Sequence, residues 1–336
     1  MKILICYHKL SPIIQNQILT PILCGAATSH EKEAFLNASR RQGFLDDTPL
    51  QSQSLAEESA ALLKMSKSNL IFANSSHAAQ DCELNAAAKQ PSQAAANNIF
   101  SQPNLSLENA NFCELSALFW AFKNLAKQDY IGLFHYRRAL DLTREGQSKP
   151  TKIRKLKNLA KFGLDEESLQ ETMSRFDIIT PTPHECSLRE HWADLHFEKD
   201  LLLAEEVIRQ TYPQMQVSAR LDATAQNCFT NVFVAKSELF YDYYKWIFDI
   251  INQMQQRINL ASYNNYQARL WGFLSEVLFN VWLDYKAREC GVKVGRFALL
   301  ESGFKRRLFG WEDDYKFRRF YFLKLRLFKG RSRWKM

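Results

Sequence analysis

The stretch from residue 111 to residue 142, NFCELSALFWAFKNLAKQDYIGLFHYRRALDL, constrains the fold most strongly. Asn111 with Glu114 three residues later is a capping-box pattern, and apolar residues then recur at helical spacing up to residue 125. After a polar break, the apolar run 130–134 is typical of a strand buried on both faces. A helix followed directly by such a strand predicts a layered α/β fold.

Polar side chains follow this strand at once: His135, Tyr136, Arg137 and Arg138. Ligands of open α/β sheets bind just beyond the carboxyl ends of the strands. Paired guanidinium groups match the oxygens of a phosphate. The sequence therefore indicates an anion site here. The alternative is a solvated turn, which is the commoner fate of two adjacent arginines, but the buried elements on either side favour a ligand site.

A second strand also ends in basic residues. The run 2–7, KILICY, is predicted to be the first, central strand, and His8 and Lys9 follow it. Such a pair is more often plain surface than site. If the two strands run parallel, however, both basic ends converge on one edge of the sheet.

Further strands are expected at 176–181, 231–235 and 292–300, and further helices at 191–212, 237–256 and 266–286. The apolar residues of the last helix form one buried face, with Glu276 near its edge. Glu276 is then either a plain exposed residue or a carboxylate lining a cleft. His184, His191 and His196 do not show a metal-ligand spacing, so no metal site is expected.

Composition limits the class of protein. Hydrophobic residues make up 46% of the 336 residues, which excludes a disordered chain and allows one large α/β domain, predicted over residues 1–300. The seven cysteines are scattered without a CxxC pair, so neither a disulfide framework nor a zinc site is indicated. We expect no signal peptide and no transmembrane helix, and therefore a cytoplasmic protein.

Two segments differ from this body. Residues 45–98 are rich in Ser, Ala, Gln and Asn and are interpreted as a variable, partly low-complexity insertion. Residues 301–336 are predicted to form a basic, helical tail; from 305 onward it holds twelve Lys/Arg against three Asp/Glu, interleaved with aromatic residues. Such a segment suits the inner-membrane surface. A nucleic-acid arm has the same ingredients, but the nearly neutral body and the bulky apolar content favour the membrane.

Several common nucleotide-binding motifs are missing from the sequence. No GxGxxG follows the first strand, and no GxxxxGK[ST] or GxSxG occurs. A basic site without these motifs leaves sugar-nucleotide chemistry, in which cations stabilise a nucleoside diphosphate leaving group. Many such enzymes hold a metal with Asp-x-Asp at a strand end. The strand ending at His135 carries arginines instead, so we expect guanidinium and imidazole groups to replace the metal.

The chain resembles the capsular-polysaccharide-synthesis proteins grouped as family 4422 of domains of unknown function, which are regarded as glycosyltransferases. The matching segments are KILICYHK at 2–9, TPILCGAA at 20–27, GFLDDT at 43–48, NFCELSALFWAFKNL at 111–125, DYIGLFHYRRAL at 129–140, FDIITP at 176–181, NVFVAKSELFYDYYKWIFDI at 231–250 and YNNYQARLWGFLSEVLFNVWL at 263–283. They run in order over nearly the whole chain.

This resemblance implies a GT-A-like fold, a single Rossmann-type nucleotide-sugar-binding domain with added helices. It implies transfer of a sugar, a hexose from a UDP-sugar, to a growing capsule or lipopolysaccharide glycan. The acceptor would be lipid-linked or a glycan, and no metal cofactor or nucleic-acid partner is expected. Two alternatives stay open, a non-catalytic partner in a glycan-synthesis complex and a nucleic-acid-binding protein that uses the basic tail.

Site roles carry over from the resemblance residue by residue. The residues bordering the donor nucleotide would be His8, Lys9, Asp46 and Asp47, and those at its diphosphate His135, Tyr136, Arg137 and Arg138. The residues facing the acceptor would be Asn231, Tyr263, Gln267 and Glu276. The catalytic set would be Glu276, as a general base, with Asn231 and His135. Asn231 is equally compatible with capping a strand end. In the family a Gly-Asp-Asn-Ile run usually follows Asp46-Asp47-Thr48, whereas here the insertion follows, which leaves the roles of both aspartates open, as it does inversion or retention.

Overall fold

The computed structural model describes residues 1–8, 16–26, 29, 45–46, 98–153 and 158–302, and the strand backbones 309–313, 317–322 and 325–331. Its main sheet contains β1 (Lys2–Tyr7), β2 (Leu19–Leu23), β3 (Leu45–Asp46), β4 (Tyr130–His135), β5 (Arg138–Glu145), β6 (Thr151–Ile153), β7 (Ile178–Pro181), β10 (Phe233–Lys236) and β11 (Val294–Ser302). The helices are α3 (Asn109–Phe112), α4 (Leu115–Asn124), α5 (Glu166–Arg175), α6 (Leu188–Ala193), α7 (Glu198–Thr211), α8 (Val217–Asp222), α9 (Ser237–Gln255) and α10 (Leu270–Glu289). A separate two-stranded antiparallel sheet pairs β8 (His184–Ser187) with β9 (Thr224–Asn227).

The sheet is mixed. Strand β1 is interior, as the sequence predicts, and it runs parallel to β2 on one side and to β4 on the other. Strand β10 pairs antiparallel with both β4 and β7. Strand β11 runs parallel to β6 and β7 and antiparallel to β5. The parallel β2–β1–β4 portion therefore presents three carboxyl ends at one edge.

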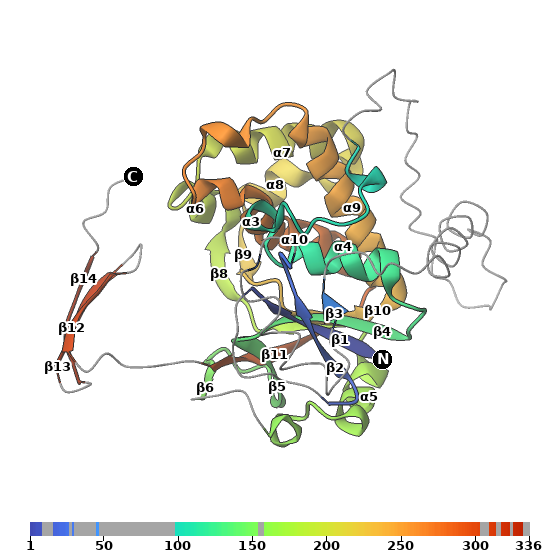
Figure 1. The fold of residues 1–336 in the computed structure, drawn as a ribbon, viewed down its shortest axis with the longest axis vertical. Helices are drawn as coiled ribbons and strands as arrows, with labels where there is room; N and C mark the ends of the chain where they lie inside the picture. The colour runs from blue at the N-terminus through green and yellow to red at the C-terminus, as the bar shows by residue number, and fades with distance from the viewer. Residues whose placement is uncertain are drawn as a thin grey trace.

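Helices cover both faces of this sheet, with α4, α9 and α10 on one face and α5 on the other (Figure 1). Strand β1 shows how the layers are built. Leu4 and Cys6 pack into the cluster with α4, α9 and α10, whereas Ile3, Ile5 and Tyr7 pack into the cluster with α5. Alternate side chains of one strand thus enter two cores, which is why the run 2–7 is apolar without a break.

The helix predicted to start at Asn111 is interrupted. Helix α3 ends at Phe112, Cys113 has a φ of +52°, and α4 begins at Leu115 with no side-chain cap from Glu114. The capping-box prediction is wrong because Asn111 Nδ2 donates instead to the carbonyl of Ala268, at 2.6 Å. The interruption turns Cys113 and Glu114 toward the start of α10.

The other elements agree with the sequence in kind and differ at their ends. The strands predicted at 176–181, 231–235 and 292–300 are β7, β10 and β11. The helix expected over 191–212 is two helices, α6 and α7, with residues 194–197 between them. The helix predicted over 237–256 is α9, whose first residue is Ser237; the Ser237 hydroxyl donates to the carbonyl of Gln128.

The C-terminal segment forms strands, so the predicted helical tail is wrong. Strands β12 (Phe309–Asp313), β13 (Phe317–Phe322) and β14 (Leu325–Arg331) make an antiparallel sheet. The sequence there is rich in Phe, Tyr and Trp, and 325–327 alternates apolar and basic residues, a pattern that suits strands better than a helix.

Most of the predicted insertion at 45–98 lies outside the described residues; only β3 and Asn98 fall within them. Among the helices that the structure describes, none combines the length and the apolar character needed to cross a bilayer.

Candidate active site

The two basic strand ends meet at one edge of the sheet. In the parallel β1–β4 pair, Cys6 lies opposite His135, so the residues that follow each strand are neighbours. The rings of His8 and His135 lie 5.8 Å apart, and His8 Nε2 is 3.5 Å from the Tyr136 hydroxyl. The Tyr136 N–H donates to the Cys6 carbonyl at 3.1 Å, which joins the two ends through the backbone.

A pocket of about 760 Å³ opens at this edge. Its lining includes five of the residues singled out from the sequence: His8, His135, Arg137, Arg138 and Glu276. They come from the ends of β1 and β4, the turn into β5, and the middle of α10. The structure therefore brings together two arginines, two histidines and one carboxyl group that are up to 268 positions apart in the chain.

His135 is a neutral imidazole in this pocket. Burial lowers its pKa to about 2, helped by the positive charges of Arg137 and Arg138 and of His8 and Arg269. The Arg137 N–H donates to His135 Nδ1 at 3.3 Å, which leaves the ring proton on Nε2. Nε2 lies 3.9 Å from Glu114 Oε1. His135 can therefore donate one hydrogen bond without adding charge.

Arg137 lies in the tight turn between β4 and β5, and Arg138 is the first residue of β5, where it pairs with His135. Both side chains are exposed and line the pocket. The guanidinium of Arg137 lies over the ring of Tyr136, 5.2 Å from its centroid. Tyr136 itself is buried and stacks on Tyr7 at 5.6 Å, so it supports the turn from below rather than lining the pocket.

Glu276 enters the pocket from α10. Burial raises its pKa to about 8; the negative charge of Glu114 raises it further, while Arg138 and Arg269 lower it. A carboxyl group with a pKa near neutrality can exchange protons at physiological pH, as a general acid or base must. Of the two interpretations given by the sequence, the structure places Glu276 in the cleft.

Three residues predicted for the acceptor side do not line the pocket. Asn231 is buried and donates to Ser275 Oγ at 3.1 Å, so it fastens the start of β10 to α10. The Tyr263 hydroxyl donates to Asp200 at 2.7 Å. Gln267 is buried behind His196, whose Nδ1 lies 3.2 Å from Gln267 Oε1. Each of these amide or phenol groups is satisfied by a protein partner.

The donor-side prediction is only partly described. Lys9 and Asp47 lie outside the described residues, as does the side chain of Asp46, whose backbone ends β3. Strand β3 runs parallel to β2, with Asp46 opposite Leu23. The backbone of Asp46 thus reaches the same edge of the sheet as the ends of β1 and β4.

The pocket also contains residues that sequence reasoning missed: Glu114, His191, His196 and Arg269. Arg269 Nε donates to Cys113 Sγ at 3.4 Å, and its guanidinium lies over Phe273 at 4.8 Å. Gly272 allows this approach, because a Cβ there would lie 2.8 Å from Cys113 Sγ. In the sequence, Glu114 is interpreted as part of a capping box. Only the tertiary contact of α3 with α10 shows that it lines the pocket. Within the described residues no group of three or more His, Cys, Asp or Glu is arranged to hold a metal ion.

Comparisons with known proteins agree with the fold. A solved structure described as "WbbM bifunctional glycosytransferase apo structure" superposes on 90% of this chain with a TM-score of 0.63 and 22% sequence identity. The chain covers 45% of that protein's length. No curated protein matches the chain. The sequence pattern of a family described as "Domain of unknown function (DUF4422)" matches residues 81–287, which is more than half of the chain, and the chain therefore belongs to that family.

Proposed function

We propose that the protein is a glycosyltransferase that moves a sugar, a hexose from a UDP-sugar, onto a growing glycan. The observation that carries the proposal is the convergence of Arg137, Arg138 and Arg269 with the carboxyl group of Glu276 in one pocket. The shared fold with a protein described as a bifunctional glycosyltransferase supports it. We also propose that the α/β core is GT-A-like and binds the nucleotide sugar as a single domain.

The guanidinium groups suit the leaving group of this reaction. When the bond between the anomeric carbon and the phosphate oxygen breaks, the electron pair stays on the diphosphate and its negative charge grows. The backbone places Arg137 and Arg138 at a strand end beside the pocket, where their guanidinium groups can stabilise that charge. The neutral Nε2–H of His135 supplies a further donor. We infer that these groups perform the task that a divalent metal performs in related chemistry.

Glu276 suits the other half of the reaction. An acceptor hydroxyl that attacks the anomeric carbon must lose its proton as the new C–O bond forms. The Glu276 carboxylate accepts that proton and becomes neutral, while the departing diphosphate gains one negative charge on the other side of the pocket. A base in this position supports direct displacement with inversion at the anomeric carbon.

Nucleotide-sugar binding tests the proposal directly. We expect calorimetry over a panel of UDP-, GDP- and dTDP-sugars to show binding of at least one UDP-sugar, unchanged by EDTA. Binding that EDTA abolishes would retain the transferase and contradict the replacement of the metal by arginine. An absence of binding to any donor would remove the proposed function and favour the non-catalytic partner or, if DNA or RNA binds with strong salt dependence, the nucleic-acid alternative.

We further propose that the acceptor is a capsule or lipopolysaccharide glycan on a lipid carrier, and that the basic aromatic segment holds the protein at the inner-membrane surface. Deleting residues 305–336 removes a net charge of +9. The truncated protein is expected to leave vesicles that contain anionic lipid, as measured by co-sedimentation, while its donor binding stays unchanged. Equal sedimentation of both proteins would contradict this role for the segment.

A further inference from the structure

One side of the pocket is built of rings rather than charges. Its members are His191 in α6, His196 just after that helix, Phe229 between β9 and β10, and Tyr266 and Phe273 around the start of α10. His191 and Phe229 stack face to face, with ring centroids 3.6 Å apart and planes inclined by 21°. Such a surface does not suit a donor diphosphate, because diphosphate recognition needs positive charge and hydrogen-bond donors.

The second group of rings packs around His196. Its ring lies 4.6 Å from that of Phe273 and is parallel to that of Tyr266 within 9°. Gln267 fixes its orientation, since Gln267 Nε2 donates to the Leu195 carbonyl at 3.0 Å and turns Oε1 toward His196 Nδ1. Burial lowers the pKa of His196 to about 4, so the ring is neutral and its Nε2 is an acceptor.

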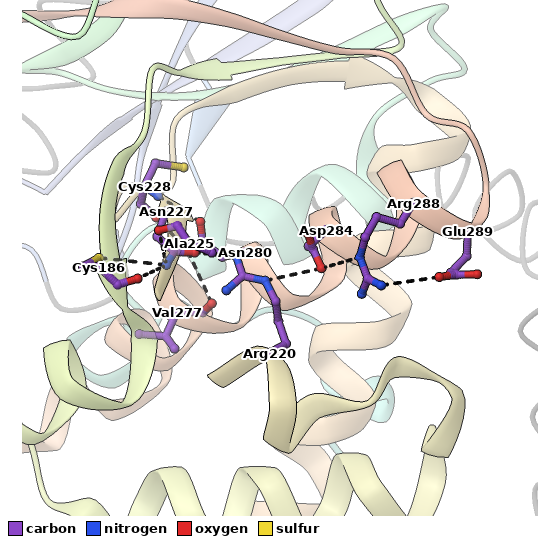
Figure 2. Close-up of polar contacts among 10 residues, drawn as sticks. All are labelled: Cys186, Arg220, Ala225, Asn227, Cys228, Val277, Asn280, Asp284, Arg288 and Glu289. Atoms are coloured by element: carbon purple, nitrogen blue, oxygen red, sulfur yellow. Dashed lines mark hydrogen bonds and ion pairs between the residues drawn. The ribbon is translucent and has the colours of Figure 1, made fainter. Parts of the chain in front are cut away.

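The segment that carries Phe229 is fastened to α10 (Figure 2). Asn280 accepts from the Cys228 N–H at 2.9 Å and donates to the Cys228 carbonyl at 2.8 Å. Beside it, the buried Asn227 donates to the Cys186 carbonyl at 2.8 Å and accepts from Arg220, which pairs with Asp284 of α10. These contacts hold the backbone next to Phe229 in place before any ligand arrives.

The rings and the carboxyl group share one helix face. Phe273, Glu276 and Val277 are three and four residues apart on α10, so their side chains lie side by side in the pocket lining. A molecule held against Phe273 therefore lies within reach of Glu276. That is the position required of an acceptor whose hydroxyl gives its proton to this residue.

We propose that this aromatic side, formed by His191, His196, Phe229, Tyr266 and Phe273, is the subsite for the acceptor sugar. A sugar ring has a C–H face that packs on aromatic rings and hydroxyl groups that bond to neutral acceptors such as His196 Nε2. The inference rests on the proposed function and deepens it: the group that is glycosylated is a sugar residue, not a protein side chain or a lipid phosphate.

Saturation-transfer difference NMR tests the subsite without knowledge of the natural acceptor. The probes are methyl glycosides of the common hexoses at millimolar concentration, with UDP present. The unaltered protein is expected to transfer saturation to the C–H protons of at least one glycoside. The Phe229→Leu variant, which keeps an apolar side chain but lacks the ring, is expected to lose that signal, whereas Phe229→Tyr keeps it.

Phe197→Leu is the matched control, because Phe197 is 41% exposed and its ring packs on Tyr263 outside the pocket lining. It should retain the signal, and circular dichroism should show all three variants folded. No transfer to any glycoside, or equal signals from Phe229→Leu and the unaltered protein, overturns the subsite. UDP-sugar binding is measured separately on the same samples, so a failed subsite with intact donor binding is distinct from failure of the transferase proposal.

Discussion

Replacing Arg137 and Arg138 together by alanine is expected to abolish detectable donor binding while the protein stays folded. Each guanidinium that bonds to a phosphate contributes about 1.5–3 kcal/mol, so losing both weakens binding roughly 10²- to 10⁴-fold. Both side chains are exposed, one in a turn and the other at the first position of β5, so the core is untouched. Isothermal titration calorimetry with the best UDP-sugar of the panel measures the change.

The matched control is the double variant Arg175→Ala/Arg257→Ala, which removes the same charge. Both arginines are about half exposed and pair with Glu145 and Glu206, away from the pocket lining. It should bind the donor as the unaltered protein does. Equal losses in the two double variants would indicate a general charge effect and contradict a phosphate site at the turn.

The arginine pair has a second, independent readout. Arg137 and Arg138 both lower the pKa of His135, after burial, which is the main cause. Their removal should therefore raise the pKa of His135, though not to its ordinary value, because the ring stays buried. Titration of the imidazole C–H resonance by NMR detects this shift, and an unchanged pKa would show that the guanidiniums do not face the ring.

Glu276→Gln is expected to lower sugar transfer about 10²- to 10⁴-fold, the usual worth of a positioned general base, with donor binding retained. The pKa of Glu276 is about 8, and the carboxylate is the active form. The rate should therefore rise about tenfold per pH unit below that value and level off above it. Transfer assays from about pH 6 to about pH 9 check this profile.

Two variants sharpen the test of Glu276. Glu114→Gln removes a negative neighbour, so the pKa of Glu276 should fall and the rising limb of the profile should move to lower pH. Glu289→Gln, at the exposed end of the same helix, should change neither the rate nor the profile. A flat profile in the unaltered protein, or full activity of Glu276→Gln, would contradict its role as the base.

The parts of this site that sequence predicts are those governed by local pattern. Uninterrupted apolar runs define β1 and β4, and a change to basic residues marks where each one ends. Once the two strands pair in parallel, geometry alone brings His8, His135 and the arginine pair to one edge. The helical spacing of 270–281 likewise places Glu276 at the border of a buried face.

Whether each of the other residues lines the pocket depends on tertiary contacts, which a local sequence pattern does not predict. Glu114 and Arg269 line the same pocket because Cys113 interrupts a helix and Gly272 lets α10 approach it. Asn231 and Tyr263 do not line the pocket, because their side chains donate hydrogen bonds to Ser275 and Asp200 instead.

The sequence by itself therefore determined the strands and their basic ends. Hydrophobic periodicity and charge act over a few residues, so they can be read without a structure. Only the tertiary structure decided which polar groups face the pocket and which form hydrogen bonds within the protein. Those hydrogen bonds join residues as far apart in the chain as Asn111 and Ala268.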